Sequence, residues 1–206
     1  MPQPPPQKQK NNFYDPGNPR VSFFMTIWYT ITGAIDQNTA NGLITWVNSQ
    51  LYSGNVSRLV VFLSSGGGDI DAAIRLYHYL KGIPIEVEIV GFSQIDSAAN
   101  TIFLAGTKRK ALQGCRFFLH EGTFYTNNTS AVLHVHEETL TIFRELLKRT
   151  IEIIATETSK SKEEITKILS EGKFYSAEEA VKFGLATEVI SKLPMSPNVV
   201  PPQQTQ

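Results

Sequence analysis

Apolar and polar positions follow a strand pattern and a helix pattern in turn along the chain. Runs rich in apolar, β-branched and aromatic residues predict strands at 21–32, 59–63, 85–90 and 115–119. The run at 59–63 is apolar at every position, which is typical of a strand buried on both faces. Apolar residues spaced three and four apart predict helices over about 37–51, 70–80, 97–106, 137–156, 162–170 and 176–183. This alternation predicts an α/β fold with right-handed crossovers and a largely parallel core sheet.

The two ends of the chain differ from the middle. Residues 1–20 are rich in proline, glutamine, lysine and asparagine, and residues 193–206 are again rich in proline. Such segments lack the apolar residues that a packed core needs. We therefore expect a flexible N-terminal arm at 1–20, one folded domain over 21–192, and a flexible C-terminal tail at 193–206.

Composition and charge narrow the class of protein. The formal net charge is zero, so nothing general favours binding to nucleic acid or to an anionic membrane. The single cysteine, Cys115, cannot form an internal disulfide, which favours a reducing compartment. The N-terminus lacks the apolar segment of a signal peptide, and the apolar run at 21–35 is shorter than a membrane span. We expect a soluble, cytoplasmic protein.

Three groups that can carry chemistry fall where predicted strands end. Gly66, Gly67 and Gly68 follow the strand at 59–63, Ser97 lies where a helix opens, and His120 follows the strand at 115–119. In an α/β sheet, binding sites form at these carboxyl ends. A glycine turn exposes backbone N–H groups, a helix start favours negative charge, and an imidazole can act as a general base. Together they indicate a hydrolase that uses a serine nucleophile.

The same residues resemble motifs of the proteolytic subunit of the Clp protease. The loop at 64–68 (SSGGG) stands where that family has N-S-P-G-G, and the segment at 93–99 (SQIDSAA) stands where it has G-Q-A-A-S-M-G. The segment at 118–122 (FLHEG) is similar to the family's M-I-H-Q-P. Residues 174–185 (FYSAEEAVKFGL) match the late signature F-x-S-A-x-E-A-x-x-x-G-L. The resemblance covers about residues 21–190.

This resemblance implies a fold, an activity and site residues. The fold would be of the ClpP/crotonase type, with superhelical β-β-α repeats and a protruding handle at about 122–156. Ser97 would be the nucleophile and His120 its base, and the backbone N–H groups of Gly68 and Ala98 would form the oxyanion hole. The activity would be that of a serine-type endopeptidase without a cofactor, acting on peptides or unfolded proteins.

The family also implies partners. Its handle joins subunits, so we expect a homo-oligomeric ring. In the family an ATP-dependent unfoldase can dock on that ring. The proline-rich N-terminus differs from the axial-loop sequence of typical Clp subunits, which argues against such docking here.

Two residues depart from the family pattern near the expected site. The family completes a triad with an aspartate just before its late signature, but Gly172 stands there and no aspartate follows Asp96. Glu171 is the nearest carboxylate and is a candidate third member. Asp96 precedes Ser97 where the family has a small neutral residue; we expect it to cap the helix and face away from the oxyanion hole.

Other features leave alternatives open. His134 and His136 form an H-x-H pair that on a strand would put both rings on one face, but we expect a polar lead into the long helix and no metal site. The cluster at 108–110 is expected to be a solvated turn, although one of its lysines could serve a Ser-Lys dyad. Besides a peptidase, the chain could be a weak or inactive Clp-like subunit, or a crotonase-type acyl-CoA enzyme.

Overall fold

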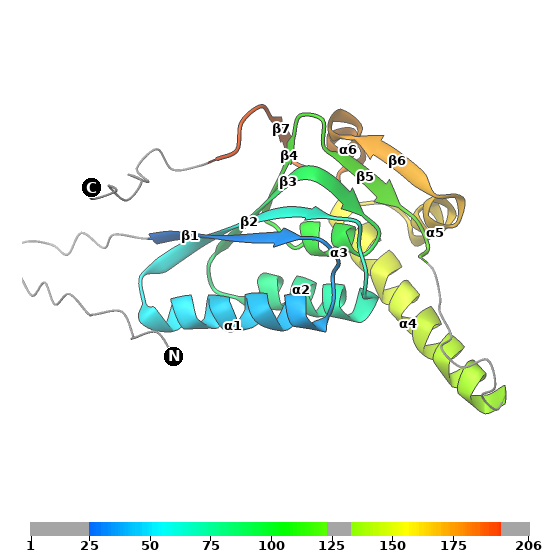
Figure 1. Ribbon diagram of the computed structural model, residues 1–206. Coiled ribbons are helices and arrows are strands. Elements are labelled where there is room, and N and C mark those ends of the chain that lie inside the picture. Colours follow the sequence, from blue (N-terminus) through cyan, green and yellow to red (C-terminus); the bar gives the residue numbers. More distant parts are fainter. Residues whose placement is uncertain (1–24, 123–132, 195–206) are drawn as a thin grey trace, which may run out of the picture.

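A largely parallel sheet forms the centre of the molecule. The computed structural model describes residues 25–122 and 133–194. These residues form a seven-stranded sheet in which β1, β2, β3, β4 and β7 follow one another in that order and pair in parallel (Figure 1). Strand β5 pairs in parallel with β3, and β6 pairs antiparallel with β5. The strands are β1 (Met25–Thr32), β2 (Val56–Ser65), β3 (Glu86–Asp96), β4 (Lys108–Leu112), β5 (Arg116–Leu119), β6 (Lys173–Ser176) and β7 (Glu188–Ile190).

The predicted parallel sheet is confirmed, but three strands were missed. Strand β4 was expected to be a solvated turn because it begins with Lys108, Arg109 and Lys110. Its lysines instead pair across the sheet with carboxylates of β3 and β7, as in the contacts of Lys110 with Glu88 and Glu188. Strands β6 and β7 are only four and three residues long. Short edge strands carry too few residues for a clear periodic pattern.

Helices cover one face of this sheet. Figure 1 shows α1 and α2 beneath β1–β3, with α3 farther along the same side. Their inward residues, such as Leu43, Leu76 and Phe103, are fully buried against the inward residues of β2 and β3. The helices are α1 (Gln37–Ser53), α2 (Ile70–Gly82), α3 (Ala99–Phe103), α4 (Leu133–Thr158), α5 (Lys162–Glu171) and α6 (Ala177–Phe183). None of the helices in the described ranges is long and apolar enough to cross a membrane.

Much of helix α4 lies outside the core of the fold. It begins at Leu133, four residues before the expected start, and runs away from the core in Figure 1. Its last turns are buried through Ile153 and Ile154, whereas Leu140 and Ile142 are exposed. The expected handle at 122–156 lies in part outside the described residues, as do the predicted arm at 1–20 and most of the predicted tail.

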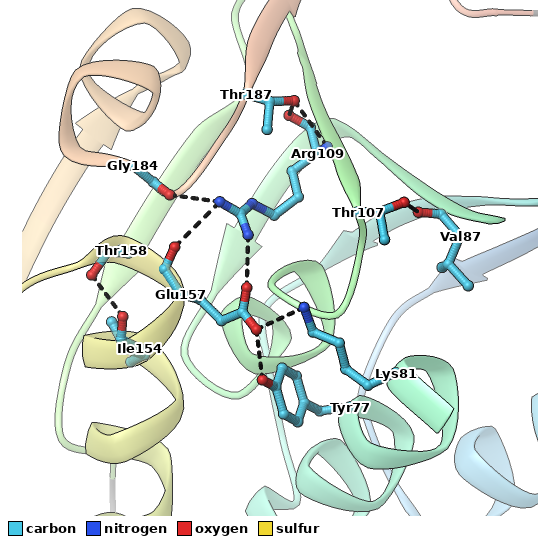
Figure 2. A network of polar contacts seen from close by, with 10 residues as sticks. All are labelled: Tyr77, Lys81, Val87, Thr107, Arg109, Ile154, Glu157, Thr158, Gly184 and Thr187. Atoms are coloured by element: carbon cyan, nitrogen blue, oxygen red, sulfur yellow. Dashed lines mark hydrogen bonds and ion pairs between the residues drawn. The ribbon is translucent and has the colours of Figure 1, made fainter. Parts of the chain in front are cut away.

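Glu157 attaches the base of α4 to the rest of the domain. Its carboxylate accepts a hydrogen bond from the Tyr77 hydroxyl at 2.7 Å and pairs with Lys81 at 2.7 Å and with Arg109 at 3.0 Å (Figure 2). Arg109 also donates to the backbone oxygen of Gly184 at 3.0 Å. The Glu157 carboxylate thus joins α4 to α2 and to β4, and Arg109 extends this network to the end of α6.

The pKa of Glu157 reflects this environment. Burial acts to raise it, but hydrogen bonds from Lys81 and Tyr77 and the charges of Lys81 and Arg109 outweigh burial and lower it below the ordinary 4.5. A carboxylate with a lowered pKa stabilises the fold above its ordinary pKa and loses that contribution as the pH falls through the folded value.

The variant Glu157→Gln should therefore cost about 2–3 kcal/mol of unfolding free energy at neutral pH, because it leaves Arg109 and Lys81 without their carboxylate. The difference from the wild type should shrink as the pH falls from about 5 to about 3. Urea unfolding at a series of pH values measures it. Glu152→Gln is the control, since Glu152 makes an exposed ion pair with Lys162 and should cost less than about 1 kcal/mol. A pH-independent difference for Glu157→Gln would contradict the expectation.

Candidate active site

Ser97 lies on a sharp turn between strand β3 and helix α3. Strand β3 ends at Asp96 and the helix begins at Ala99, so only two residues make the turn. Ser97 has a φ of +56°, a left-handed conformation that costs a non-glycine residue about 1–2 kcal/mol. Its N–H donates to the backbone oxygen of Phe118 at 2.8 Å, which extends the pairing of β3 with β5 by one residue. The turn therefore presents Ser97 beside the strand that carries His120.

The glycine loop packs directly against this turn. Gly67 has a φ of +96°, and a Cβ atom added there would lie 2.6 Å from the Cβ of Ser97 and 3.1 Å from the amide nitrogen of Ala98. No side chain fits in that space. The loop is held by Ile35, whose N–H donates to the oxygen of Gly67 and whose oxygen accepts from the N–H of Asp69. The glycines allow the backbone to approach the serine closely.

Two backbone N–H groups beside Ser97 are without a protein partner. Among the described residues, the N–H of Gly68 and that of Ala98 donate to no protein acceptor. Gly68 follows the glycine that touches Ser97, and Ala98 follows Ser97 itself. Unbonded N–H groups at such a place can bind an oxyanion or another negatively charged oxygen.

His120 follows β5, and its ring stacks on one member of an aromatic pair. The imidazole lies on the ring of Phe118, with centroids 4.7 Å apart and planes 13° apart, and Phe118 in turn stacks on Phe174 at 4.1 Å. The Nδ1 atom of His120 accepts a hydrogen bond from the N–H of Gly122 at 3.1 Å. An Nδ1 atom that accepts carries no proton, so the neutral ring has its proton on Nε2.

One pocket contains both side chains. Ser97, Ala98 and His120 line it together with residues of α2, α4, α5, the end of β5 and the segment after it, most of them apolar: Ile70, Leu119, Glu121, Leu147, Thr150, Ile154 and Leu169. Within the described part of the chain, no hydrogen bond joins Ser97 to His120. The structure thus brings Ser97, Ala98 and His120 to one pocket, with the glycine loop against the serine.

The candidate third member, Glu171, lies on the last turn of α5. Its side chain is 61% exposed and its ion-pair partner is Lys167 at 3.9 Å. No hydrogen bond or ion pair recorded for it reaches His120. The next residue, Gly172, lies beside His120: a Cβ atom there would lie 4.0 Å from the Cβ of His120 and 3.5–3.6 Å from the ring of Phe118.

The expectation that Asp96 caps a helix is wrong. Asp96 is the last residue of β3, and α3 has no side-chain cap. The Asp96 carboxylate is buried and pairs with the guanidinium of Arg116 at 2.9 Å. Arg116 also donates to Gln94 at 3.0 Å and lies 5.6 Å from the ring centroid of Phe174. The negative charge next to Ser97 is therefore paired with a positive one on the neighbouring strand.

The structure also bears on two alternatives that the sequence left open. His134 and His136 lie on helix α4, not on a strand, so residues two apart do not share one face. Within 25–122 and 133–194, no group of three or more histidine, cysteine or carboxylate side chains could hold a metal ion. Lys108 and Lys110 pair with Glu86 and Glu88, which leaves a Ser-Lys dyad without support from them.

Sequence reasoning missed three residues that surround the site. Asn100 bonds to the backbone of Ser97 and Phe118, Phe118 stacks on His120, and Arg116 pairs with Asp96. A polar residue inside the apolar segment at 98–105 was a signal for Asn100. The aromatic residues at 118 and 174 gave no sign that they would meet, because strand pairing brings them together.

The comparison with known proteins decides the family. A family model described as "Clp protease" matches residues 22–193, which is most of the chain. The chain belongs to the Clp protease family. Its fold agrees with that of a ClpP1 mutant from Listeria monocytogenes, with a TM-score of 0.71, 25% identity, and coverage of 81% of this chain and 92% of that one. The predicted family and fold class are confirmed.

Curated relatives agree with this assignment. ATP-dependent Clp protease proteolytic subunit 2 of Frankia casuarinae is 29% identical over 132 residues, which are 63% of this chain and 59% of that relative. The subunit of the same name from Pseudomonas aeruginosa is 25% identical over 162 residues, 78% of this chain and 79% of that relative. In the Frankia relative, less than two thirds of the length is matched.

Proposed function

We propose that this chain is a serine-type endopeptidase subunit that hydrolyses peptide bonds in peptides or unfolded proteins. In this proposal Ser97 is the nucleophile, His120 is the general base, and the N–H groups of Gly68 and Ala98 form the oxyanion hole. The observation that carries it is the left-handed Ser97 turn, which shares a pocket with His120 and lies beside two unbonded N–H groups. Family membership supports the same activity.

The chemistry follows from what each group can do. A serine hydroxyl is too weak an acid to attack an amide unaided, so His120 would take its proton as the Ser97 oxygen attacks the carbonyl carbon. The tetrahedral oxyanion would accept hydrogen bonds from the N–H groups of Gly68 and Ala98. The protonated imidazole would then give its proton to the leaving amine. Water would hydrolyse the acyl-enzyme by the same steps, with His120 again acting as base.

The hydrogen bond from Gly122 to His120 favours a slow enzyme. A base that acts through Nε2 needs its neutral-state proton on Nδ1, but Nδ1 here accepts from a backbone N–H. In a complete triad a carboxylate holds the proton on Nδ1 and stabilises the imidazolium. This observation supports the alternative, a catalytically weak or inactive Clp-like subunit, in which the low rate would follow from the missing carboxylate.

The first test uses a fluorophosphonate probe. We expect labelling of Ser97 alone, and its complete loss in Ser97→Ala, because Ser97 shares a pocket with His120 and has two unbonded N–H groups beside it. Gly68→Ala should slow labelling by about 100- to 1000-fold, the usual effect of losing one oxyanion donor. A Cβ there would lie 2.2 Å from the oxygen of Ile35 and so displace the loop. Ser93→Ala, on the exposed part of β3, is the control, and labelling that persists in Ser97→Ala would refute the assignment.

The second test concerns the third triad position. Gly172→Asp should raise peptide cleavage by about tenfold or more, because its carboxylate would lie beside His120 and compete with Gly122 for Nδ1. Gly172 has a φ of +69°, so the variant should also lose about 1–3 kcal/mol of stability to backbone strain.

Gly172→Asn is the matched control, since it carries the same strain and shape without the charge and should not gain activity. Glu171→Ala should change the rate little, because the side chain is exposed and paired with Lys167. Peptide cleavage and thermal unfolding of the three variants measure both effects. A large loss in Glu171→Ala, or equal rates for Gly172→Asp and Gly172→Asn, would contradict this assignment.

We further propose that the chain forms a homo-oligomeric ring through α4, as the family implies. Exposed apolar side chains at Leu140 and Ile142 support this, because contact of large apolar side chains with solvent is unfavourable. Light scattering of the purified protein at micromolar concentration should give a mass several times that of one chain. Ile142→Glu should lower that mass, whereas Lys148→Glu at an exposed polar position should not. A monodisperse monomer in the wild type would contradict the proposal.

A further inference from the structure

Asn100 is a polar side chain enclosed in the core next to the site. It lies on α3, is fully buried, and has Ala99, Ile102 and Phe103 as buried neighbours on the same helix. A buried amide is unfavourable unless it is hydrogen-bonded. The Nδ2 group of Asn100 donates to two backbone oxygens, that of Ser97 at 3.1 Å and that of Phe118 at 2.9 Å.

These two bonds belong to a set of four that joins three residues. The oxygen of Phe118 also accepts from the N–H of Ser97 at 2.8 Å, and the oxygen of Ser97 also accepts from the N–H of Asn100 at 3.0 Å. Each carbonyl therefore receives one bond from a backbone N–H and one from the Asn100 side chain. The Asn100 amide is the only side chain among the described residues that bridges the serine turn and strand β5 in this way.

The bridge ends close to both reactive groups. Ser97 is one of the bonded residues, and Phe118 is two residues before His120 and stacks on its ring. Phe118 is thus held through its carbonyl by Asn100 and touches His120 through its side chain. A shift of the Ser97 turn relative to β5 would change the distance between the serine hydroxyl and the imidazole, and this is the shift that the bridge opposes.

We propose that Asn100 is a positioning residue for the Ser97–His120 pair. It holds the left-handed Ser97 turn against β5 and so limits changes in the separation between the Ser97 hydroxyl and the His120 ring. The proposal rests on the proposed peptidase function for its effect on rate, while the bridge itself can be tested without activity. Asn100 touches neither substrate nor reacting atoms and acts through Ser97 and Phe118.

The rest of the Asn100 side chain helps to separate positioning from folding. Its Oδ1 atom is buried and has no hydrogen-bond partner. Replacement by leucine, of similar size, removes this unsatisfied oxygen, and both carbonyls keep the backbone bond that each already accepts. Asn100→Leu should therefore fold with little change in stability but lose the bridge.

Thr101 provides a matched control on the same helix. It is also fully buried, and its Oγ1 atom has no hydrogen-bond partner. Thr101→Val makes the same kind of exchange, a buried polar side chain for an apolar one of equal shape, without breaking a bond to Ser97 or Phe118.

The experiment compares the two variants with the wild type in peptide cleavage, fluorophosphonate labelling and thermal unfolding. Asn100→Leu should lower kcat and the labelling rate by about 10- to 100-fold, because small displacements of reacting groups have effects of this size. KM and the unfolding temperature should stay near their wild-type values. Thr101→Val should match the wild type in all four quantities.

Amide hydrogen exchange tests the Asn100 bridge without any measurement of activity. The N–H of Ser97 should be protected in the wild type and in Thr101→Val, and should exchange at least tenfold faster in Asn100→Leu. Wild-type protein that neither cleaves peptides nor reacts with the probe would refute the proposed function, and the exchange rates would still decide whether the bridge holds the turn. Unchanged kcat, or unchanged exchange at Ser97, in Asn100→Leu would overturn the positioning role.

Discussion

The site depends on the way in which strand β3 pairs with two strands along one of its edges. Residues Glu88–Gly91 pair with β4, and residues Gln94–Asp96 pair with β5. The strand changes partner near Gly91, where an added Cβ would lie 3.0 Å from the Ile95 side chain and 3.3 Å from the sulfur of Cys115. This double pairing brings the end of β3 beside the end of β5. Ser97 and His120 follow these two ends, so their proximity is a result of sheet topology.

Aromatic stacking fixes the ring plane of His120, and hydrogen bonding fixes which of its nitrogens carries the proton. The Phe118 ring limits the plane in which the imidazole can lie, and Phe174 supports Phe118 from the other side. Stacking does not select which nitrogen carries the proton. That choice is made by the partner of Nδ1, which is a backbone donor here. A histidine can therefore have its ring plane fixed by stacking and still hold its proton on Nε2, the nitrogen through which it would act as a base.

Much of the fold was predictable because its central strands are short apolar runs followed by turn residues. Strand β2, the helix α1 capped by Asp36, and the capping box of α6 at Ser176 and Glu179 have strong local signals. Strand β4 was missed because its charged residues are satisfied by carboxylates of neighbouring strands, which no local pattern reveals.

The candidate site was also predictable only in part. The serine turn, the glycine loop and the histidine were visible as residues at strand ends; the structure places Ser97 and His120 at one pocket and packs the glycine loop against the serine. The partners of these residues were not visible, because they come from pairings between distant segments. Arg116 reaches Asp96 across the β3–β5 pairing, and Asn100 reaches Phe118 across the same boundary. The role of Asp96 was misjudged for this reason.

The glycine at 172 also has a meaning at the level of the gene. A glycine codon that ends in a pyrimidine becomes an aspartate codon by a single base change. The space beside Phe118 and His120 already accepts the first atom of such a side chain at ordinary contact distance. With such a codon, a site that has the third carboxylate and a site that lacks it would differ by one point mutation and by the cost of one strained backbone angle.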